Sequence, residues 1–273
     1  MGEESGSDDK VKGTIDAVTG LVKAVPVYED LLQPVAKQLG KSLETVGKAI
    51  NVALFPVSGL VWGYENIQVF LATKLANRLK DVPPEDIIAP KPNVAGPAIE
   101  ALRYTGHEEA LSDMYANLLA AAMDKNTATG AHPAFVEIIK QLTPDEAKLI
   151  GLFLQPIPLP LITVRAEHKV MGRGGLDVAV NVSLFGEMAN LELPELVPTY
   201  LDNLCRLGLT DIEPKYSYTD KSIYHELENS SQIKVHQQQV ALQPDHVCKL
   251  SHAAVKVTNL GKQFGGICVK GRD

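Results

Sequence analysis

The sequence predicts an α+β fold that is predominantly α, in which an N-terminal helical domain precedes a winged-helix-like α/β domain. From Thr14 to Leu79 the apolar residues recur at intervals of three and four, which is the helical period. In residues 176–184 every second residue is apolar, which is the strand period. Helix, hairpin, helix and terminal strands then follow in the order of a winged-helix domain.

Composition and proline positions set the predicted domain boundaries. Residues 1–12 are expected to be a disordered tail, because MGEESGSDDK offers no apolar anchor. The helical domain covers 13–142, and its segment 81–97 is expected to be an extended connector because it holds five prolines. The winged-helix-like domain covers 143–273, with an insertion at about 213–247.

Residues typical of helix ends place elements in the second half. Thr143 is a candidate N-cap, and Pro144 fits the first position of the helix that follows. Gly208 is a candidate C-cap for a helix that begins near Leu193. Two further helices are predicted at residues 98–104 and 108–123. A β-hairpin is predicted at residues 161–171 with 176–184, and short terminal strands at residues 256–269.

The charge of the chain limits its partners. The formal net charge is −7 at pH 7, which disfavours nucleic acid as a partner. The helix predicted over residues 193–209 would contact DNA in a winged-helix domain. It carries the acidic residues Glu195 and Asp202 and a single basic residue, Arg206. Three widely separated cysteines and an N-terminus unlike a signal peptide predict a cytoplasmic protein. Contact with the periphery of the inner membrane is the alternative location.

The motifs of nucleotide-binding, hydrolytic and metal-dependent enzymes are missing or incomplete, so we expect a non-enzymatic protein with no catalytic residue, cofactor or metal. Gly40-Lys41-Ser42 lacks the earlier glycine of a phosphate-binding loop. A strand would place His246, Cys248 and His252 on one face, but the two histidines would lie about 20 Å apart, too far for one zinc ion. His132 is expected to start a helix, and Cys205 to lie in a core.

The segment 49–64 is the most apolar part of the chain and holds its single tryptophan. It is shorter than the roughly 20 residues that span a bilayer, and Pro56 interrupts it. A buried helical hairpin is the favoured interpretation, and a surface for membrane or partner contact is the alternative. The candidate residues of that surface are Phe55, Pro56, Val57, Leu60 and Trp62.

Residues 27–67 and 132–150 resemble the abortive infection alpha family, and the resemblance extends over roughly residues 25–210. It implies antiviral defence, in which an infected bacterial cell is disabled before the phage multiplies. It brings no catalytic residues with it.

We therefore expect a non-enzymatic defence protein whose helical domain contacts a phage or host protein, or a membrane. Homo-oligomer formation is left open. A winged-helix DNA-binding regulator and an enzyme of an unrecognised class are the alternative functions.

Overall fold

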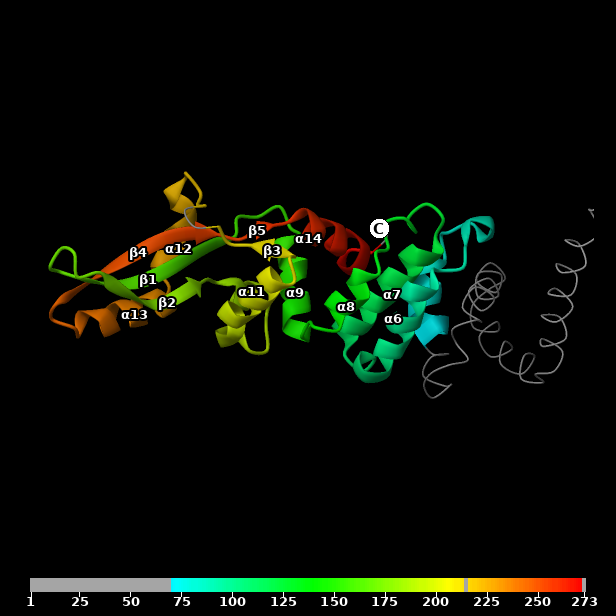
Figure 1. Cartoon of the computed structure of the whole chain (residues 1–273), viewed down its shortest axis with the longest axis horizontal. Coiled ribbons are helices and arrows are strands. Elements are labelled where there is room, and N and C mark those ends of the chain that lie inside the picture. The colour runs from blue at the N-terminus through cyan, green and yellow to red at the C-terminus, as the bar shows by residue number, and fades with distance from the viewer. Residues whose placement is uncertain (1–69, 214–215, 272–273) are drawn as a thin grey trace, which may run out of the picture.

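The computed structural model describes residues 70–213 and 216–271 (Figure 1). The predicted tail and most of the helical run that ends at Leu79 lie outside these residues. The described part is elongated, with the helices α6 and α7 towards one end and a β-sheet at the other (Figure 1). It is α+β and predominantly helical, as the sequence predicts.

The helical end is built around α7, whose buried residues occupy most of its circumference. A helix that is apolar on nearly all sides has to be surrounded by other elements. α6 and α8 pack on it, together with the C-terminal segment of the chain. The elements of this end are the π-helix η1 (Leu71–Leu75), α5 (Ala76–Leu79), the 3-10 helix η2 (Pro84–Asp86), α6 (Pro92–Thr105), α7 (Glu109–Met123) and α8 (Ala134–Ile139).

The prediction of an extended connector over 81–97 is wrong in its second part, because α6 begins at Pro92. Proline suits the first turn of a helix, where its missing N–H would have no partner. Pro97 lies inside α6 and leaves the carbonyl of Asn93 without a helical donor. Asn93 is exposed, so water can bond to that carbonyl, and the helix continues through the second proline.

The predicted start of α9 (Pro144–Phe153) is confirmed. The Thr143 hydroxyl accepts a hydrogen bond from the Glu146 N–H at 3.2 Å, and the Glu146 carboxylate accepts one from the Thr143 N–H at 2.7 Å. These two bonds form a capping box, which satisfies backbone donors at the helix N-terminus. These two hydrogen bonds therefore hold the first turn of α9 in place.

A three-stranded antiparallel sheet forms the opposite end of the described structure, in the order β2-β1-β4. β1 (Pro160–His168) and β2 (Gly175–Val182) are the predicted hairpin, which is confirmed. β4 (His246–Ala254) pairs with β1 along its whole length without a register shift. β2 carries two register shifts against β1, and Asn181 has a positive φ of 56° beside one of them.

Short helices cover one face of this sheet and join it to the helical end. Gly208 ends α11 with a φ of +73°, which confirms the predicted C-cap. The elements are α10 (Phe185–Met188), the 3-10 helix η3 (Pro194–Leu196), α11 (Val197–Arg206), β3 (Thr210–Asp211), the 3-10 helix η4 (Lys221–Tyr224), α12 (His225–Glu228), α13 (Ser231–Ala241) and β5 (Lys256–Val257).

The prediction of terminal strands over 256–269 is wrong beyond β5. The chain turns into α14 (Asn259–Phe264) and the π-helix η5 (Gly265–Val269). The Thr258 hydroxyl caps α14 by accepting the Gly261 N–H at 2.9 Å. Tertiary packing then favours the helix, because Phe264 and Cys268 enter the core of the helical end. The winged-helix assignment within this half remains a prediction.

The buried hydrophobic side chains of the described residues form two cores. The larger core joins the helical end, α9, α11 and the C-terminal segment. It includes Ile139 and Leu149, which lie on either side of the predicted domain boundary. The smaller core lies between the sheet and the helices α12 and α13, around Ile162, Val164 and Ile233. The C-terminal segment thus crosses back from the sheet to the helical end (Figure 1).

Candidate functional site

The five predicted contact residues lie outside the described residues, so their burial or exposure stays a prediction. They are Phe55, Pro56, Val57, Leu60 and Trp62.

His132 and Cys205, which the sequence also singled out, have mainly structural surroundings. The His132 Nδ1 atom accepts the Ala134 N–H at 3.1 Å, which confirms its place at a helix start. Cys205 is half-buried and lies 3.4 Å from the Thr210 hydroxyl. Burial raises the pKa of the Cys205 thiol, which disfavours the thiolate that a nucleophile needs.

The strand β4 places His246, Cys248 and His252 on one face, as the sequence predicts. Each has a different neighbour. His246 packs edge-to-face against His168 with 5.2 Å between ring centroids, and His252 bonds to Glu228. Burial raises the pKa of Cys248, so its thiol stays protonated. Within the described residues, no three His, Cys, Asp or Glu side chains gather as metal ligands.

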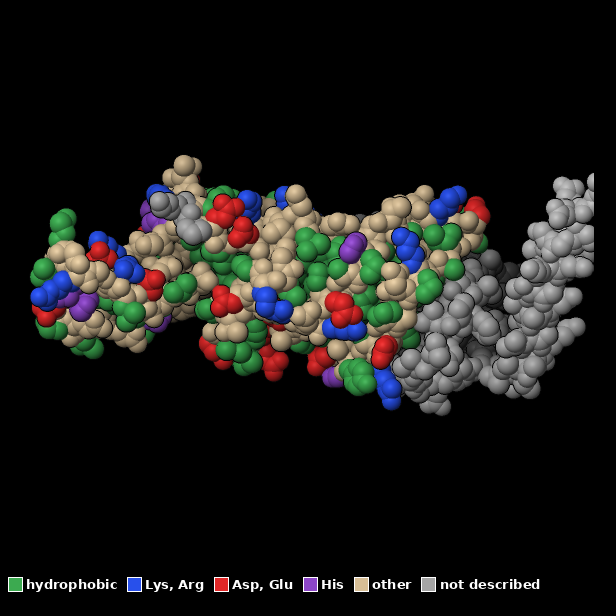
Figure 2. Space-filling model, in the orientation of Figure 1, with side chains coloured by type: hydrophobic (Ala, Val, Ile, Leu, Met, Phe, Trp, Pro, Cys, Tyr) green, Lys and Arg blue, Asp and Glu red, His purple; other side chains and the backbone are tan. Residues whose placement is uncertain are grey.

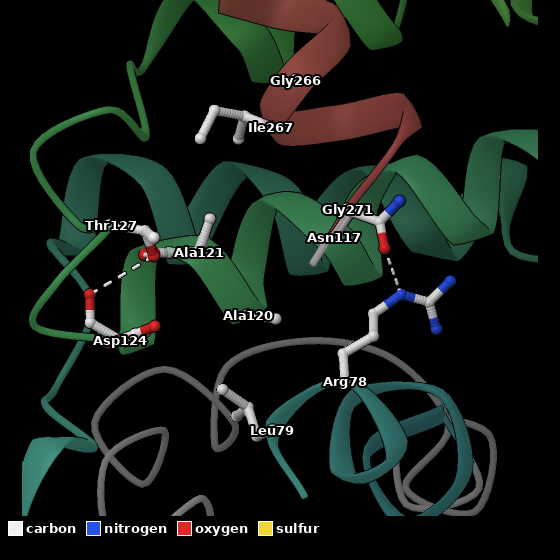
Figure 3. Close-up of a pocket in the computed structure, with 10 residues that line it drawn as sticks. All are labelled: Arg78, Leu79, Asn117, Ala120, Ala121, Asp124, Thr127, Gly266, Ile267 and Gly271. Carbon is white, nitrogen blue, oxygen red and sulfur yellow. Dashed lines mark hydrogen bonds between the residues drawn. The ribbon is translucent and has the colours of Figure 1, made fainter. Parts of the chain in front are cut away.

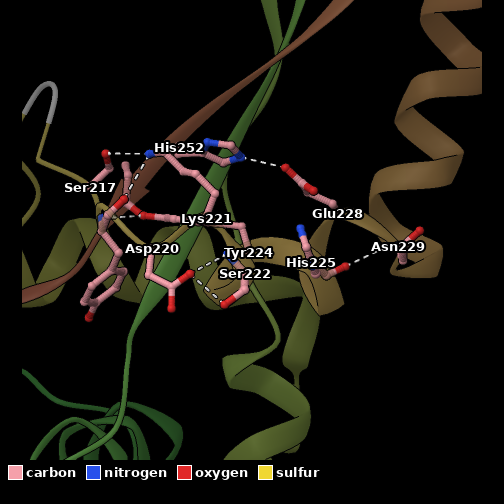
Figure 4. Close-up of polar contacts among 11 residues, drawn as sticks. Ser217, Asp220, Lys221, Ser222, Tyr224, His225, Glu228, Asn229 and His252 are labelled. Carbon is pink, nitrogen blue, oxygen red and sulfur yellow. Dashed lines mark hydrogen bonds and ion pairs between the residues drawn. The ribbon is translucent and has the colours of Figure 1, made fainter.

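A polar cluster joins β4 to η4 and α12 (Figure 4). The His252 Nε2 atom lies 2.7 Å from the Glu228 Oε1 atom. The His252 ring stacks on Tyr224 at 4.2 Å between centroids and an interplanar angle of 30°. The Lys221 ammonium lies 5.5 Å from the centroid of the same tyrosine ring, within cation–π range. Tyr224 is therefore the centre of the cluster.

The Tyr224 hydroxyl makes two hydrogen bonds to the backbone. It donates to the Ala253 carbonyl at 2.9 Å and accepts the Tyr218 N–H at 3.0 Å. Burial raises the pKa of Tyr224, so the hydroxyl remains a donor at neutral pH. These bonds attach the segment 218–228 to β4. The cluster fastens the segment 218–228 to the sheet.

A cavity of about 90 Å³ lies between α5, α7 and η5 (Figure 3). Asn117, on α7, lies beside it and is nearly buried. Its amide nitrogen donates to the Cys268 carbonyl at 2.9 Å, and its amide oxygen accepts from the Arg78 guanidinium. Asn117 thus links α5 to the C-terminal segment through α7. The cavity is small, and two of the polar residues that line it, Arg78 and Asn117, are engaged in this link.

Two neighbouring turns form the far end of the sheet. The turn between β1 and β2 is bonded to the turn before β4, because the Lys169 N–H donates to the Asp245 carbonyl at 2.8 Å. The Lys169 ammonium also donates to the Pro244 carbonyl at 2.5 Å. The His168 Nδ1 atom accepts the Val170 N–H at 2.9 Å and fixes the start of the first turn. Both turns are held in place by these bonds.

The side chains of these turns form what we call the tip surface, which consists of Lys169, Val170, Met171, Arg173 and Leu242. Met171 is 99% exposed and Leu242 is 84% exposed. Hydrophobic and basic side chains lie at this end of the molecule, together with acidic and histidine side chains (Figure 2). Exposed apolar residues that are clustered on an ordered surface are typical of interaction sites.

A second exposed apolar group lies where α10, η3 and α11 meet. Its hydrophobic side chains alternate along the chain with carboxylates, and hydrophobic side chains lie between acidic ones below α11 (Figure 2). We call this the acidic corner, and it consists of Glu187, Met188, Glu192, Leu193, Glu195 and Leu196.

The buried side chain of Asp145 holds the backbone of the acidic corner in place. The Asp145 carboxylate accepts the N–H groups of Glu192 at 3.0 Å and Leu193 at 2.9 Å. Burial of Asp145 opposes ionisation, but these bonds and Lys148 outweigh it and lower the pKa of the carboxyl. Gly186 approaches Pro194 so closely that an added Cβ would lie 2.6 Å from the proline Cβ. The corner is thus a rigid surface.

We predict that the purified protein does not bind duplex DNA specifically. α11 lies beside the acidic corner, and the guanidinium of Arg206 is bonded to Asn203 and Gln141. Phosphate contacts require several free cations on one surface. Gel-shift titration at physiological salt should show no sequence-specific shift. Nanomolar binding under those conditions would contradict this prediction.

The chain is similar to a known protein family along most of its length. The sequence model of a protein family described as abortive infection alpha matches residues 63–268, which is most of the chain. The chain belongs to the abortive infection alpha family. Membership in the abortive infection alpha family places the protein in defence against phage, as the sequence resemblance implies.

One solved structure is similar to this abortive infection alpha protein. It is described as the uncharacterized protein from the hydrocarbon-degrading marine bacterium Alcanivorax borkumensis SK2, and it is 20% identical over 48% of this chain and 89% of that chain. The TM-score of 0.32 does not establish a common fold. The curated proteins include no match. Among the described residues, each helix is too short or too polar to cross a bilayer.

Proposed function

We propose that this abortive infection alpha protein acts in phage defence without catalysis, by contact with a partner through the tip surface. One observation carries the proposal: Met171 and Leu242 are 99% and 84% exposed on turns that hydrogen bonds hold in place. Burying apolar side chains of this size against a partner is favourable by about 1.5 to 3 kcal/mol each. Turns that are already ordered lose little entropy on binding.

The tip surface is a candidate contact surface among the described residues, whereas the role of the segment 49–64 stays a prediction. The apolar side chains of the tip surface are flanked by Lys169 and Arg173, which are exposed. The net charge of the chain has little influence there, because charges separated by more than about 10 Å are largely screened at 0.1 M salt. The tip can therefore bind a partner that is apolar and negatively charged.

The double variant Met171→Glu and Leu242→Glu should abolish protection against phage and leave the protein folded. Both side chains are exposed, so we expect the free energy of unfolding to change by about 0.5 kcal/mol or less. The measurements are the efficiency of plating on cells that express each variant, and the melting temperature of the purified protein. Tyr104→Glu is the control, because Tyr104 is 67% exposed at the helical end.

Protection that persists in the folded double variant would contradict the proposal. Loss of protection in the Tyr104→Glu control as well would also contradict it, because the tip would then have no special role. Flotation with phosphatidylglycerol vesicles distinguishes a membrane from a protein partner. Vesicle binding that the double variant loses would identify a membrane, and no vesicle binding would indicate a protein.

A further inference from the structure

The tip surface and the acidic corner have opposite charges and similar apolar character. The tip surface combines Val170, Met171 and Leu242 with the two cations Lys169 and Arg173, and one exposed carboxylate, Asp245, lies in the turn before β4. The acidic corner combines three apolar side chains, which are 37% to 49% exposed, with three carboxylates. Within the part of the chain that the structure describes, these carboxylates form no ion pair, although they are exposed. Each surface thus has the composition that the other would bind.

We infer that the tip surface of one copy of this chain binds the acidic corner of a second copy. This inference rests on the proposed function and names its partner. In such a contact Lys169 and Arg173 would meet the carboxylates of the corner, and the apolar side chains of both surfaces would be buried together. Complementary charge on two apolar surfaces of this kind favours the correct pairing over others.

The two surfaces of one molecule do not satisfy each other. The tip lies beyond β1 and β2, whereas the corner lies beside α11 towards the middle of the molecule (Figures 1 and 2). Contact between them therefore requires a second copy. Because different surfaces meet, the contact is heterologous, and each added copy leaves one tip and one corner open. The assembly extends as a chain of copies, unless its rotation closes a ring.

Rigidity on both sides supports the contact. The corner is fixed by Asp145 and by the close approach of Gly186 to Pro194, and the tip by the bonds of Lys169. Preorganised surfaces bind with a smaller entropic cost. The surfaces are small, however, so we expect weak association that depends on concentration. A local rise in concentration would then promote assembly.

The experiment uses charge reversal on the full-length chain. The tip variant is Met171→Glu with Arg173→Glu, and the corner variant is Glu192→Lys with Glu195→Lys. Lys169 is left unchanged because its ammonium holds the two turns together. Sedimentation equilibrium from about 10 to 500 µM should show association of the wild type, in the range expected for small interfaces. Each variant alone should associate at least about tenfold more weakly.

Two combinations make the test specific. The protein with all four substitutions should regain association, because its acidic tip meets a basic corner. An equimolar mixture of the tip variant with the corner variant should also regain association, because the intact tip meets the intact corner and the acidic tip meets the basic corner. The pair Glu85→Lys with Glu226→Lys is the control for net charge, and we expect it to associate like the wild type.

Three results would overturn the inference: a monomeric wild type at 500 µM, no restored association in the fourfold variant, or equal weakening by the control pair. If either variant fails to fold, Leu193→Gln with Leu196→Gln tests the corner without charge reversal, and unchanged association would again overturn it. A monomeric wild type whose tip variants still lose phage protection would leave the proposed function standing and exclude a second copy as its partner. Vesicle binding through the tip surface would likewise leave the proposed function standing, and it would identify a membrane instead of a second copy as the partner.

Discussion

Phe264→Ala should lower the free energy of unfolding by about 3 to 5 kcal/mol, the range for truncating a buried phenylalanine. Phe264 lies on α14, is completely buried, and packs edge-to-face against Phe135 with 5.4 Å between ring centroids. The substitution leaves a cavity where α14 meets α8, and the surrounding helices relax into it incompletely. Denaturant unfolding followed by circular dichroism measures the loss.

Leu260→Ala is the matched control for this prediction. Leu260 lies one turn before Phe264 on α14 and is 37% exposed. Its truncation removes less buried surface, and we expect a loss of about 1 kcal/mol or less. Equal losses for the two variants would show that the position of Phe264 in the core has no special weight, and would contradict the packing described above.

Gly261→Ala should destabilise the protein by about 3 kcal/mol, at the upper end of the range for overpacking. A Cβ at this position would lie 2.0 Å from the Leu209 carbonyl oxygen. That oxygen already accepts the Thr258 N–H at 3.1 Å, so it is held in place. The added methyl group can be accommodated only if α14 moves away from Leu209, which immediately precedes β3. A melting curve of the variant measures the effect.

Gly266→Ala is the matched control within the same segment, because a Cβ there meets nothing within 4 Å. Its backbone lies in the π-helix η5, where alanine is better tolerated than glycine. We expect unchanged stability or a gain of a few tenths of a kcal/mol. If Gly266→Ala were as destabilising as Gly261→Ala, the close approach of α14 to Leu209 would not be the cause.

Local signals in the sequence predict much of the second half correctly. The cap at Thr143 and the C-cap at Gly208 are confirmed, because both depend on hydrogen bonds and backbone angles within a few residues. The hairpin of β1 and β2 follows from alternation and from a glycine turn. Each of these features is decided by short-range interactions, which the order of residues specifies directly.

The errors arise where distant parts of the chain meet. Residues 259–269 have the glycines and alternating apolar residues of short strands, but packing of Phe264 and Cys268 on the helical end selects a helix. The corner at Glu192 and Leu193 depends on the carboxylate of Asp145, which lies 47 and 48 residues earlier. Sequence periodicity contains no information about such contacts.

The tip surface was also missed, and the reason is physical. Gly172 and Gly174 predict a turn, and Met171 beside them carries no mark that distinguishes an exposed side chain from a buried one. Its exposure follows from the length of β1 and β2, which carry the turn beyond the helices that cover the sheet. A weak signal was available in the sequence, since Lys169 and Arg173 flank two apolar residues in a turn.

The return of the C-terminal segment has a consequence for the synthesis of the protein. Asn117 bonds to the Cys268 carbonyl across 151 residues of sequence, and Phe264 completes the core around Phe135. Contacts of such long range slow folding, because a large loop must close before they form. The ribosome has to synthesise the chain as far as Cys268 before the helical end can close. A transcript that ends early would therefore yield a protein with an open core, which is prone to aggregation and degradation.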